Sequence, residues 1–354
     1  MEPILCGPSA MRYIRVPPLV RSMYPQVSFD SYRFGGARTV NDAFIVDNIG
    51  FPLHMLAESL LGRTGAKGIR WHLVSGELPI GSVVWDEGLD LQMTSPLMTL
   101  FTLSRTVSDA HLLMAMYEFC GTFTLFKPAP HIEQSLARAM SQASLGAAEG
   151  WQPVRNAAGK PTNLWKRPPL IELHELHSFA HEVEHLRGGK RFAKIAAKVS
   201  GVTASPFEVQ ASLLFGLRRS EGGKGLGGFT NNHEIRLTRA ARRIAGRERV
   251  YADLYFEGEQ GRSPLVIECQ GGLVHGTESA SLSDADRIAA LQAMGIDVLP
   301  LTYKQISDPD NFERIAHHVA AKLGRPYREK SERLRAKEDE LRRSIFIDWL
   351  TLGE

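Results

Sequence analysis

The sequence predicts a mixed α/β protein with more than one domain. Its 354 residues exceed what a single hydrophobic core usually serves. The composition, with 43% hydrophobic and 23% charged residues, is typical of a globular protein. Along the chain, short runs of β-branched and aromatic residues alternate with runs of helical periodicity, and this alternation is typical of α/β structure.

Composition and charge exclude several classes of protein. No run of about 18 apolar residues occurs, so we expect no membrane span and no membrane partner. The first eight residues lack the basic and apolar regions of a secretory signal. Cys6, Cys120 and Cys269 are odd in number and far apart, which favours reduced thiols in a cytoplasmic protein. The net charge of +3 is too small to indicate nucleic-acid binding by itself.

Residues 1–126 are expected to form an α+β domain. Ser95 followed by Pro96 predicts a helix start, with Ser as the N-cap and Pro in the first helical position. Gly121 predicts the end of a second helix. The expected elements are strands over 68–74 and 80–85, helices from Ser95 and over 109–119, and a strand over 121–126.

Residues 127–200 are expected to form a helical linker region. Proline residues near its start separate it from the first domain. We expect a helix over 131–148, a loop over 150–169, and a long polar helix over 170–200 that Gly188 and Gly189 break.

Residues 201–325 are expected to form a second α/β domain, followed by a charged C-terminal helix in 326–354. Tail residues Phe346, Ile347, Trp349 and Leu350 are expected to pack against the rest of the protein. The expected elements of the domain are a helix over 205–217, a glycine-rich loop over 222–228, a strand near 233–238, strands over 250–256 and 264–270, a helix over 283–294, a strand over 297–301 and a helix over 309–323.

Two acids mark a candidate site in this domain. Asp253 lies within one predicted strand, and Glu268 lies near the end of the next. If the two strands form a hairpin, both carboxylates lie at one end of the sheet and must share a proton or a cation. Hard oxygen ligands of this kind suit Mg²⁺ or Mn²⁺, which can activate water and stabilise charge on a phosphodiester.

This region resembles the PD-(D/E)XK nucleases, and more narrowly their branch related to very-short-patch-repair endonucleases. The positions that carry the resemblance are Asp253, Glu268, Gln270, Gly271, His275, Asp284, Asp286, Arg287, Gly295, Val298 and Leu299. The resemblance implies a restriction-endonuclease-like fold and a metal-dependent nuclease acting on DNA. It implies that Asp253 and Glu268 bind the metal, that Gln270 orients water, and that Glu208 and His275 join the site.

Each of these roles has an alternative. Gln270 stands where the fold often carries Lys, and a Gln side chain cannot act as a charged base. The chain could therefore be an inactive nucleic-acid-binding or regulatory protein that keeps the nuclease fold. Glu208 could simply complete a capping box with Ser205, and His275 could be an ordinary loop histidine.

Basic residues are concentrated just before the two acids. Such a cluster predicts salt-dependent contacts with the phosphate backbone, and the alternative is a solvated basic loop. The residues expected to contact nucleic acid are Arg218, Arg219, Lys224, Arg236, Arg239, Arg242 and Arg243.

The N-terminal part has a second resemblance. Residues 88–105 are similar to the strand, Ser-Pro and helix segment of abortive-infection antitoxin-like proteins. This resemblance implies a regulatory module in a defence or toxin–antitoxin-like system. No helix-turn-helix is recognisable at the start of the chain, so DNA reading by this part is not expected, while a protein partner or a homodimer stays open.

Overall fold

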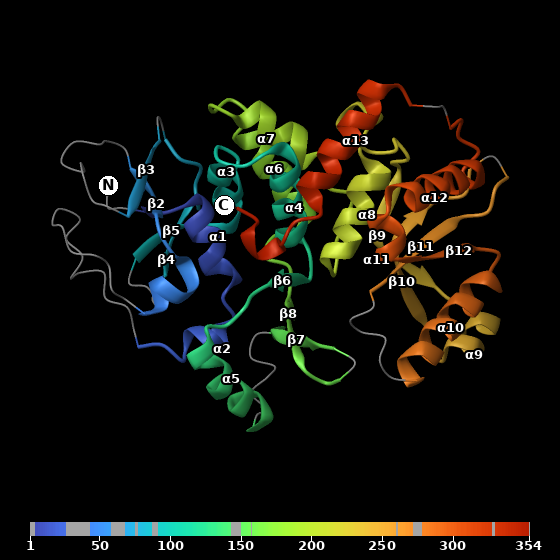
Figure 1. Ribbon diagram of the computed structural model, residues 1–354, viewed down its shortest axis with the longest axis horizontal. Helices are drawn as coiled ribbons and strands as arrows, with labels where there is room; N and C mark the ends of the chain where they lie inside the picture. The colour runs from blue at the N-terminus through green and yellow to red at the C-terminus, as the bar shows by residue number, and fades with distance from the viewer. Residues whose placement is uncertain are drawn as a thin grey trace.

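The protein is described from a computed structural model. The described residues are 4–25, 43–57, 68–74, 77–86, 91–142, 150–156, 158–259, 261–271, 278–327 and 330–353. The chain is mixed α/β, as expected, and its described strands form three sheets (Figure 1). No helix among these residues combines the length and the apolar character that a membrane span requires.

The first sheet has five strands in the order β3-β2-β1-β5-β4. Its central strand, β1, runs parallel to β5 and antiparallel to β2. The strands are β1 (Ile4–Leu5), β2 (Leu53–Ala57), β3 (Ile69–Leu73), β4 (Val83–Asp86) and β5 (Leu91–Thr94). The helices of this part are α1 (Gly7–Arg15), α2 (Pro18–Arg21), the π-helix η2 (Ile45–Ile49), α3 (Pro96–Leu103) and α4 (Asp109–Cys120).

Local sequence accounts for the ends of α3 and α4. Ser95 caps α3 by accepting a hydrogen bond from the Met98 amide, as expected. Gly121 follows α4, but its φ of −83° is not left-handed. A Cβ there would lie 2.6 Å from the Thr203 carbonyl oxygen and 2.7 Å from that of Tyr117. Glycine is therefore required after α4 because the backbone at Thr203 and Tyr117 lies too close to position 121 for a side chain.

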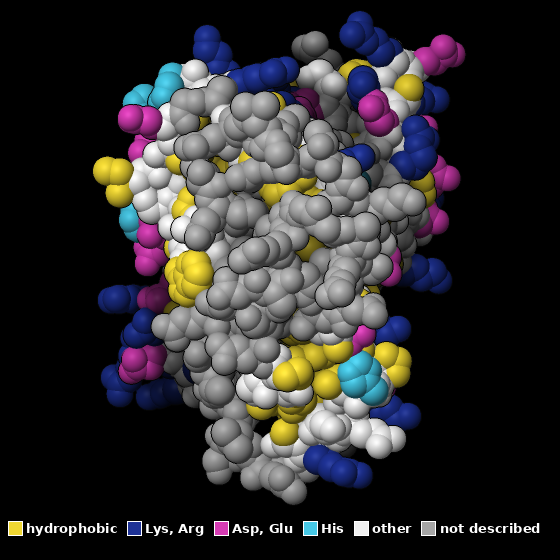
Figure 2. All heavy atoms as spheres, turned by 90° about the vertical axis from the view of Figure 1, so that its left-hand side faces the viewer, with side chains coloured by type: hydrophobic (Ala, Val, Ile, Leu, Met, Phe, Trp, Pro, Cys, Tyr) yellow, Lys and Arg dark blue, Asp and Glu magenta, His cyan; other side chains and the backbone are white. Residues whose placement is uncertain are grey.

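The surface on the N-terminal side carries both signs of charge among its described side chains, with hydrophobic groups between them (Figure 2). Exposed hydrophobic side chains in this part include Leu73, Val84 and Trp85. The described part of this face therefore gives no separate basis for nucleic-acid binding.

The second sheet, in the order β6-β8-β7, lies in the region that joins the two ends of the molecule. It consists of β6 (Phe123–Leu125), β7 (Gln152–Arg155) and β8 (Pro161–Lys166), and α5 spans Pro130–Gln142. The expected loop over 150–169 is therefore wrong. Strands β7 and β8 were missed because they contain prolines and lack hydrophobic alternation. The turn between them is closed by the Asn156 side chain, which accepts hydrogen bonds from the amides of Ala158 and Lys160.

The expected long helix over 170–200 is two helices, α6 (Leu173–Glu182) and α7 (Gly189–Ala196). The predicted break at the two glycines is confirmed. Gly188 has a left-handed φ of +94°, and a Cβ on Gly189 would lie 1.9 Å from the Val183 carbonyl oxygen. Only glycine fits both positions.

The third sheet has the order β12-β11-β10-β9. Strands β9, β10 and β11 form an antiparallel meander, and β12 runs parallel to β11. The elements of this part are α8 (Pro206–Gly216), the 3₁₀ helix η4 (Arg219–Glu221), β9 (Phe229–Arg236), α9 (Arg239–Ala245), β10 (Arg249–Phe256), β11 (Leu265–Gln270), α10 (Glu278–Gln292), β12 (Asp297–Thr302), α11 (Tyr303–Ser307) and α12 (Pro309–Lys322).

Helices cover both faces of this sheet (Figure 1). On one face, Val266 shares a hydrophobic cluster with Ala241 of α9 and Leu291 of α10. On the other, Ile267 belongs to the main core with Phe215 of α8 and Phe312 of α12. Successive residues of β11 thus face opposite helix layers.

The C-terminal tail returns to the first part of the protein (Figure 1). It contains α13 (Glu332–Ile345) and the 3₁₀ helix η5 (Trp349–Thr351). The Trp349 ring packs against Phe123 at 5.9 Å, and its carbonyl oxygen accepts a hydrogen bond from Arg15. The expected packing of the tail against the body is confirmed at Trp349.

Candidate active site

Asp253 and Glu268 lie where β10 and β11 separate. The antiparallel register of these strands ends at the pair Leu254 and Ile267, and the same register would next oppose Asp253 to Glu268. Directly opposed residues of an antiparallel pair share one face of the sheet. Beyond that point the Asp253 carboxylate accepts a hydrogen bond from the Cys269 amide at 2.7 Å. This side chain therefore replaces the backbone pairing that would otherwise join β10 to β11.

An irregularity in β9 and β10 sets the position of Asp253. The pairing of these strands omits the positions of Asn232 and Asp253, and Asn232 has a φ of +50°. On the two sides of this point, Ala252 packs in the α9/α10 cluster and Leu254 packs in the main core. The strand therefore changes face at Asp253, which allows its carboxylate to reach β11.

Glu208 reaches the same place from the first turn of α8. Its carboxylate accepts hydrogen bonds from the Ala204 amide at 2.7 Å and from the Ser205 hydroxyl at 2.8 Å. Burial, and then the charge of Asp253, raise the pKa of Glu208 to about 8, although these hydrogen bonds and Arg287 oppose the shift. Ser205 caps α8 by accepting from the Glu208 amide, but the Glu208 carboxylate binds the Ala204 amide and the Ser205 hydroxyl instead of the Ser205 amide, so only half of the expected capping box is formed. Glu208 also interacts electrostatically with Asp253.

Glu268 is buried on β11 and forms an ion pair with Arg287 of α10, with 2.7 Å between Nη2 and Oε2. The sequence included Arg287 in the family resemblance but gave it no role. A role for Arg287 could have been expected from the burial of Glu268, because a buried carboxylate needs a cationic partner. Burial, followed by Asp253, Glu208 and Glu268, raises the pKa of the neighbouring Cys269 thiol. All three acids therefore interact electrostatically with Cys269 on β11.

The acids do not form a ready-made metal cage. Within the described residues, no three His, Cys, Asp or Glu side chains are arranged to hold a metal ion. Carboxylate oxygens suit Mg²⁺ or Mn²⁺ in their chemistry, but Glu268 is paired with Arg287. Gln270 is half-buried two residues beyond Glu268 on β11, whereas His275 lies outside the described residues.

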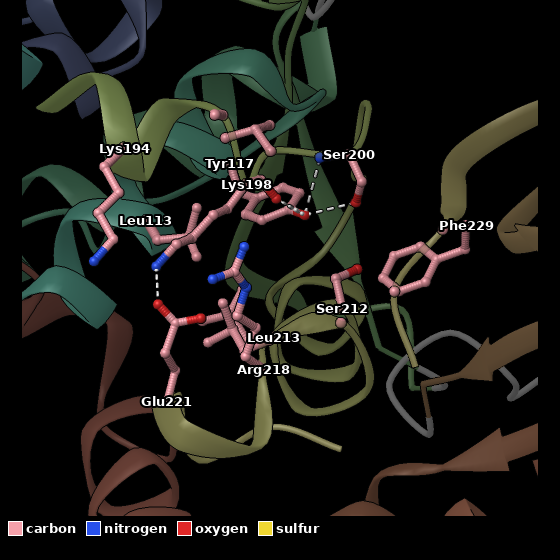
Figure 3. Close-up of a pocket in the computed structure, with 16 residues that line it drawn as sticks. Leu113, Tyr117, Lys194, Lys198, Ser200, Ser212, Leu213, Arg218, Glu221 and Phe229 are labelled. Atoms are coloured by element: carbon pink, nitrogen blue, oxygen red, sulfur yellow. Dashed lines mark hydrogen bonds and ion pairs between the residues drawn. The ribbon is translucent and has the colours of Figure 1, made fainter. Parts of the chain in front are cut away.

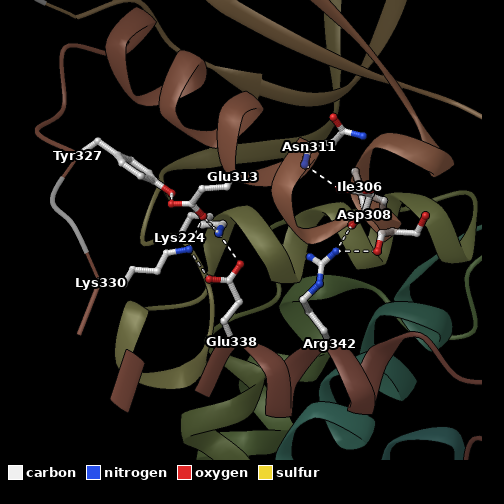
Figure 4. Close-up of polar contacts among 10 residues, drawn as sticks. Lys224, Ile306, Asp308, Asn311, Glu313, Tyr327, Lys330, Glu338 and Arg342 are labelled. Carbon is white, nitrogen blue, oxygen red and sulfur yellow. Dashed lines mark hydrogen bonds and ion pairs between the residues drawn. The ribbon is translucent and has the colours of Figure 1, made fainter. Parts of the chain in front are cut away.

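Lys224 does not occupy the position expected of a nucleic-acid contact. Its ammonium group is buried and forms ion pairs with Glu313 of α12 and Glu338 of α13 (Figure 4). Lys330 pairs with the same two carboxylates. Lys224 is therefore unavailable to a phosphate, which corrects the expectation and gives it a role in holding the C-terminal helix.

The other expected basic contacts fall into two groups. Arg218 and Arg219 lie at and beside the start of η4. Arg236, Arg239, Arg242 and Arg243 are exposed on or just before α9, and these four define the α9 surface. Two of them have weak acidic partners, since Arg236 lies 3.6 Å from Glu234 and Arg242 lies 3.6 Å from Glu248. Exposed pairs of this length leave the cations available to phosphate.

No protein-family model, curated protein or solved structure matches this chain. The geometry around Asp253 is therefore the basis for assigning a function.

Proposed function

We propose that this protein is a metal-dependent nuclease that hydrolyses DNA phosphodiester bonds. The observation that carries the proposal is the placement of Asp253 and Glu268 where β10 and β11 separate, with the Asp253 carboxylate bound to the Cys269 amide and Glu208 of α8 in electrostatic contact with Asp253. The elements around these acids run in the order α8, β9, α9, β10, β11, α10 and β12. An acid on each of two antiparallel strands, followed by a helix and a parallel strand, is consistent with the PD-(D/E)XK resemblance.

In this proposal, Asp253 and Glu268 bind Mg²⁺ or Mn²⁺, and Glu208 contributes from α8. The ion would supply a Lewis acid and lower the pKa of bound water. To hold the ion, Glu268 would share or release its contact with Arg287, since Nη2 of Arg287 lies 2.7 Å from its Oε2. The Gln270 amide oxygen can accept a hydrogen bond from water and so orient it, without acting as a charged base.

The α9 surface supplies a place for the nucleic-acid backbone. Helix α9 packs against α10, the helix that carries Arg287, on one face of the sheet. A strand bound along α9 would therefore lie on the side from which Arg287 reaches Glu268. The N-terminal resemblance adds the proposal that the nuclease works in a defence or toxin–antitoxin-like system.

A second function is favoured by the ion pair between Arg287 and Glu268. With this pair closed and Gln270 in place of the common Lys, the protein would bind nucleic acid or regulate a partner without turnover. The pair then has a structural role, because it neutralises a buried carboxylate.

A cleavage assay distinguishes the two functions. Purified wild type, Gln270→Ala and Glu268→Gln are incubated with single- and double-stranded DNA in Mg²⁺ or Mn²⁺. We expect Gln270→Ala to lose on the order of 10²-fold in rate, the typical cost of one positioning group, and Glu268→Gln to lose cleavage altogether. Glu257→Ala, an exposed acid after β10, is the matched control and should cleave like wild type.

Absence of metal-dependent cleavage by wild type, or equal trace cleavage by all variants, would favour the regulatory function. RNA substrates belong in the same assay, since cleavage of RNA alone would contradict the assignment to DNA. Thermal unfolding of each variant checks that the loss is not one of folding.

A further inference from the structure

A cavity of about 490 Å³ lies between α4, α7, α8 and the start of β9 (Figure 3). This volume is within the usual range of small-molecule sites, about 300–1,000 Å³. None of its lining residues belongs to the acid site. The cavity connects parts of the chain that are distant in sequence, from Leu113 on α4 to Phe229 on β9.

Part of the cavity lining is apolar. It includes the side chains of Leu113, Val199, Leu213 and Phe229. Gly216, Gly227 and Gly228 also line it, and they present only backbone. These glycines pack closely against other parts of the protein. A Cβ would lie 3.0 Å from the Phe229 ring at Gly216, 3.2 Å from the Gly216 carbonyl oxygen at Gly227 and 3.4 Å from the Arg325 guanidinium at Gly228. A ring in the cavity would therefore contact the apolar side chains.

The charged residues of the lining are mostly cations. The lining residues include Lys194, Lys198 and Arg218 but a single acid, Glu221. Lys198 and Glu221 neutralise each other at 2.6 Å. No hydrogen bond or ion pair joins the side chain of Lys194 or Arg218 to another described residue, and Figure 3 shows the Arg218 guanidinium among the lining residues. The cavity thus holds two positive charges without an acidic partner in the described chain.

Hydrogen bonds connect this cavity to the strand of Asp253. The Tyr117 and Ser200 hydroxyls lie 2.8 Å apart, and Ser200 donates to the Asn231 side chain at 2.7 Å. The Asn231 amide donates to the Ser212 hydroxyl and to the Asp253 carbonyl oxygen. A ligand that touches Tyr117, Ser200 or Ser212 therefore touches a network that ends on the backbone of Asp253.

We propose that this cavity binds a nucleoside phosphate. The ring contacts the apolar side chains, and the phosphate is held by the exposed Arg218 and Lys194, whose charges suit charge-assisted hydrogen bonds to phosphate oxygens. The ligand has two possible sources, a free nucleotide or the phosphorylated end of a nucleic-acid strand, and both present the same chemistry. Binding here does not require the metal centre, so the proposal stands apart from the nuclease function.

Isothermal titration calorimetry tests the proposal with AMP, adenosine and inorganic phosphate as probes. Wild type should bind AMP at least tenfold more tightly than adenosine or phosphate alone, because only AMP fills both parts of the cavity. Hydrogen bonds to charged groups contribute about 1.5–3 kcal/mol, so Arg218→Ala should weaken AMP binding on the order of 10- to 100-fold. Lys194→Ala should weaken it in the same direction.

Two controls isolate the site. Lys190→Ala removes an exposed lysine from the same helix as Lys194, away from the cavity lining, and should bind AMP like wild type. Glu268→Gln should also bind AMP normally, so that loss of cleavage and loss of this site are separate results. Absence of AMP binding, equal binding of adenosine, or an unchanged affinity in Arg218→Ala would each overturn the proposal.

The same titration identifies the source of the ligand. A 5′-phosphorylated dinucleotide and its unphosphorylated form are compared with AMP. Tighter binding of the phosphorylated dinucleotide than of AMP supports recognition of a strand end. Tighter binding of AMP supports a free nucleotide.

Discussion

The rings of His54 on β2 and His72 on β3 contact each other in the first sheet, where these two strands run side by side. Nδ1 of His54 lies 2.9 Å from Nε2 of His72, and the rings stack with centroids 5.0 Å apart. One nitrogen must donate and the other accept. Burial, then His72 and the nearby Arg70 and Arg12, lower the pKa of His54 to about 4. Burial and nearby arginines also lower the pKa of His72.

This pair predicts a loss of stability in acid. The folded pKa of His54 lies below the unfolded value of about 6.5, so the unfolded state binds more protons as the pH falls. The stability is complete above about pH 6.5 and decreases as the pH falls toward 4. His54→Gln removes this titration but keeps an acceptor for His72. Between pH 7.5 and 4.5, wild type should lose on the order of 2 kcal/mol more unfolding free energy than the variant, measured by urea denaturation. Equal losses would exclude His54 as the source.

At the same scale, the sequence could predict the acids but not their partners. Asp253 and Glu268 were predictable because they stand on successive strands of a readable meander. The burial of Lys224 was not, because its partners Glu313 and Glu338 lie 89 and 114 residues away along the chain. For the same reason the sequence could not show that Arg342 donates to the Ile306 carbonyl oxygen or that Glu338 binds the two lysines.

Among the elements, those with local end signals were predictable. Ser95 and Ser205 both cap helices that begin with proline, and the glycine break between α6 and α7 is real. The short helix α9 was missed because it has only seven residues and the only side chain it fully buries is the small Ala241, so its hydrophobic periodicity is weak. Helix α11, with five residues, is too short to show one.

The arginines of α9 predict a specific effect on nucleic-acid binding. Charge reversal in Arg242→Glu with Arg243→Glu should weaken binding and lower the steepness of its salt dependence by about two units, because each phosphate contact contributes roughly 0.9 to the slope. Arg333→Glu with Arg335→Glu, on exposed positions of α13, is the control for net charge. Fluorescence anisotropy of labelled duplex DNA over a range of salt concentrations gives both slopes. Identical slopes in the two double variants would rule out α9 as the contact.

For the whole molecule, one hydrophobic cluster includes residues from each of the four parts expected from the sequence. It contains Leu112, Leu176, Phe215 and Leu341, and it extends from Ile4 to Leu352. Within the first of these parts, Arg15 and Glu118 form a buried ion pair with two hydrogen bonds of 2.9 and 2.6 Å. The division at 126, 200 and 325 stays a prediction about folding units, whereas this one cluster includes side chains from all four parts.

Trp349 tests whether this shared cluster makes the protein unfold as a unit. Its side chain is buried at the point where the tail meets Phe123, and its carbonyl oxygen accepts from Arg15. Trp349→Ala should cost about 3–5 kcal/mol through lost burial and the cavity left behind. If the parts share one cooperative unit, amide hydrogen exchange should accelerate in β2 of the first sheet and in β10 of the third. Thr351→Ala, at an exposed position two residues away, should leave both strands protected. Faster exchange confined to β6 and α4, with β10 unchanged, would instead mean that the third sheet opens independently of the tail.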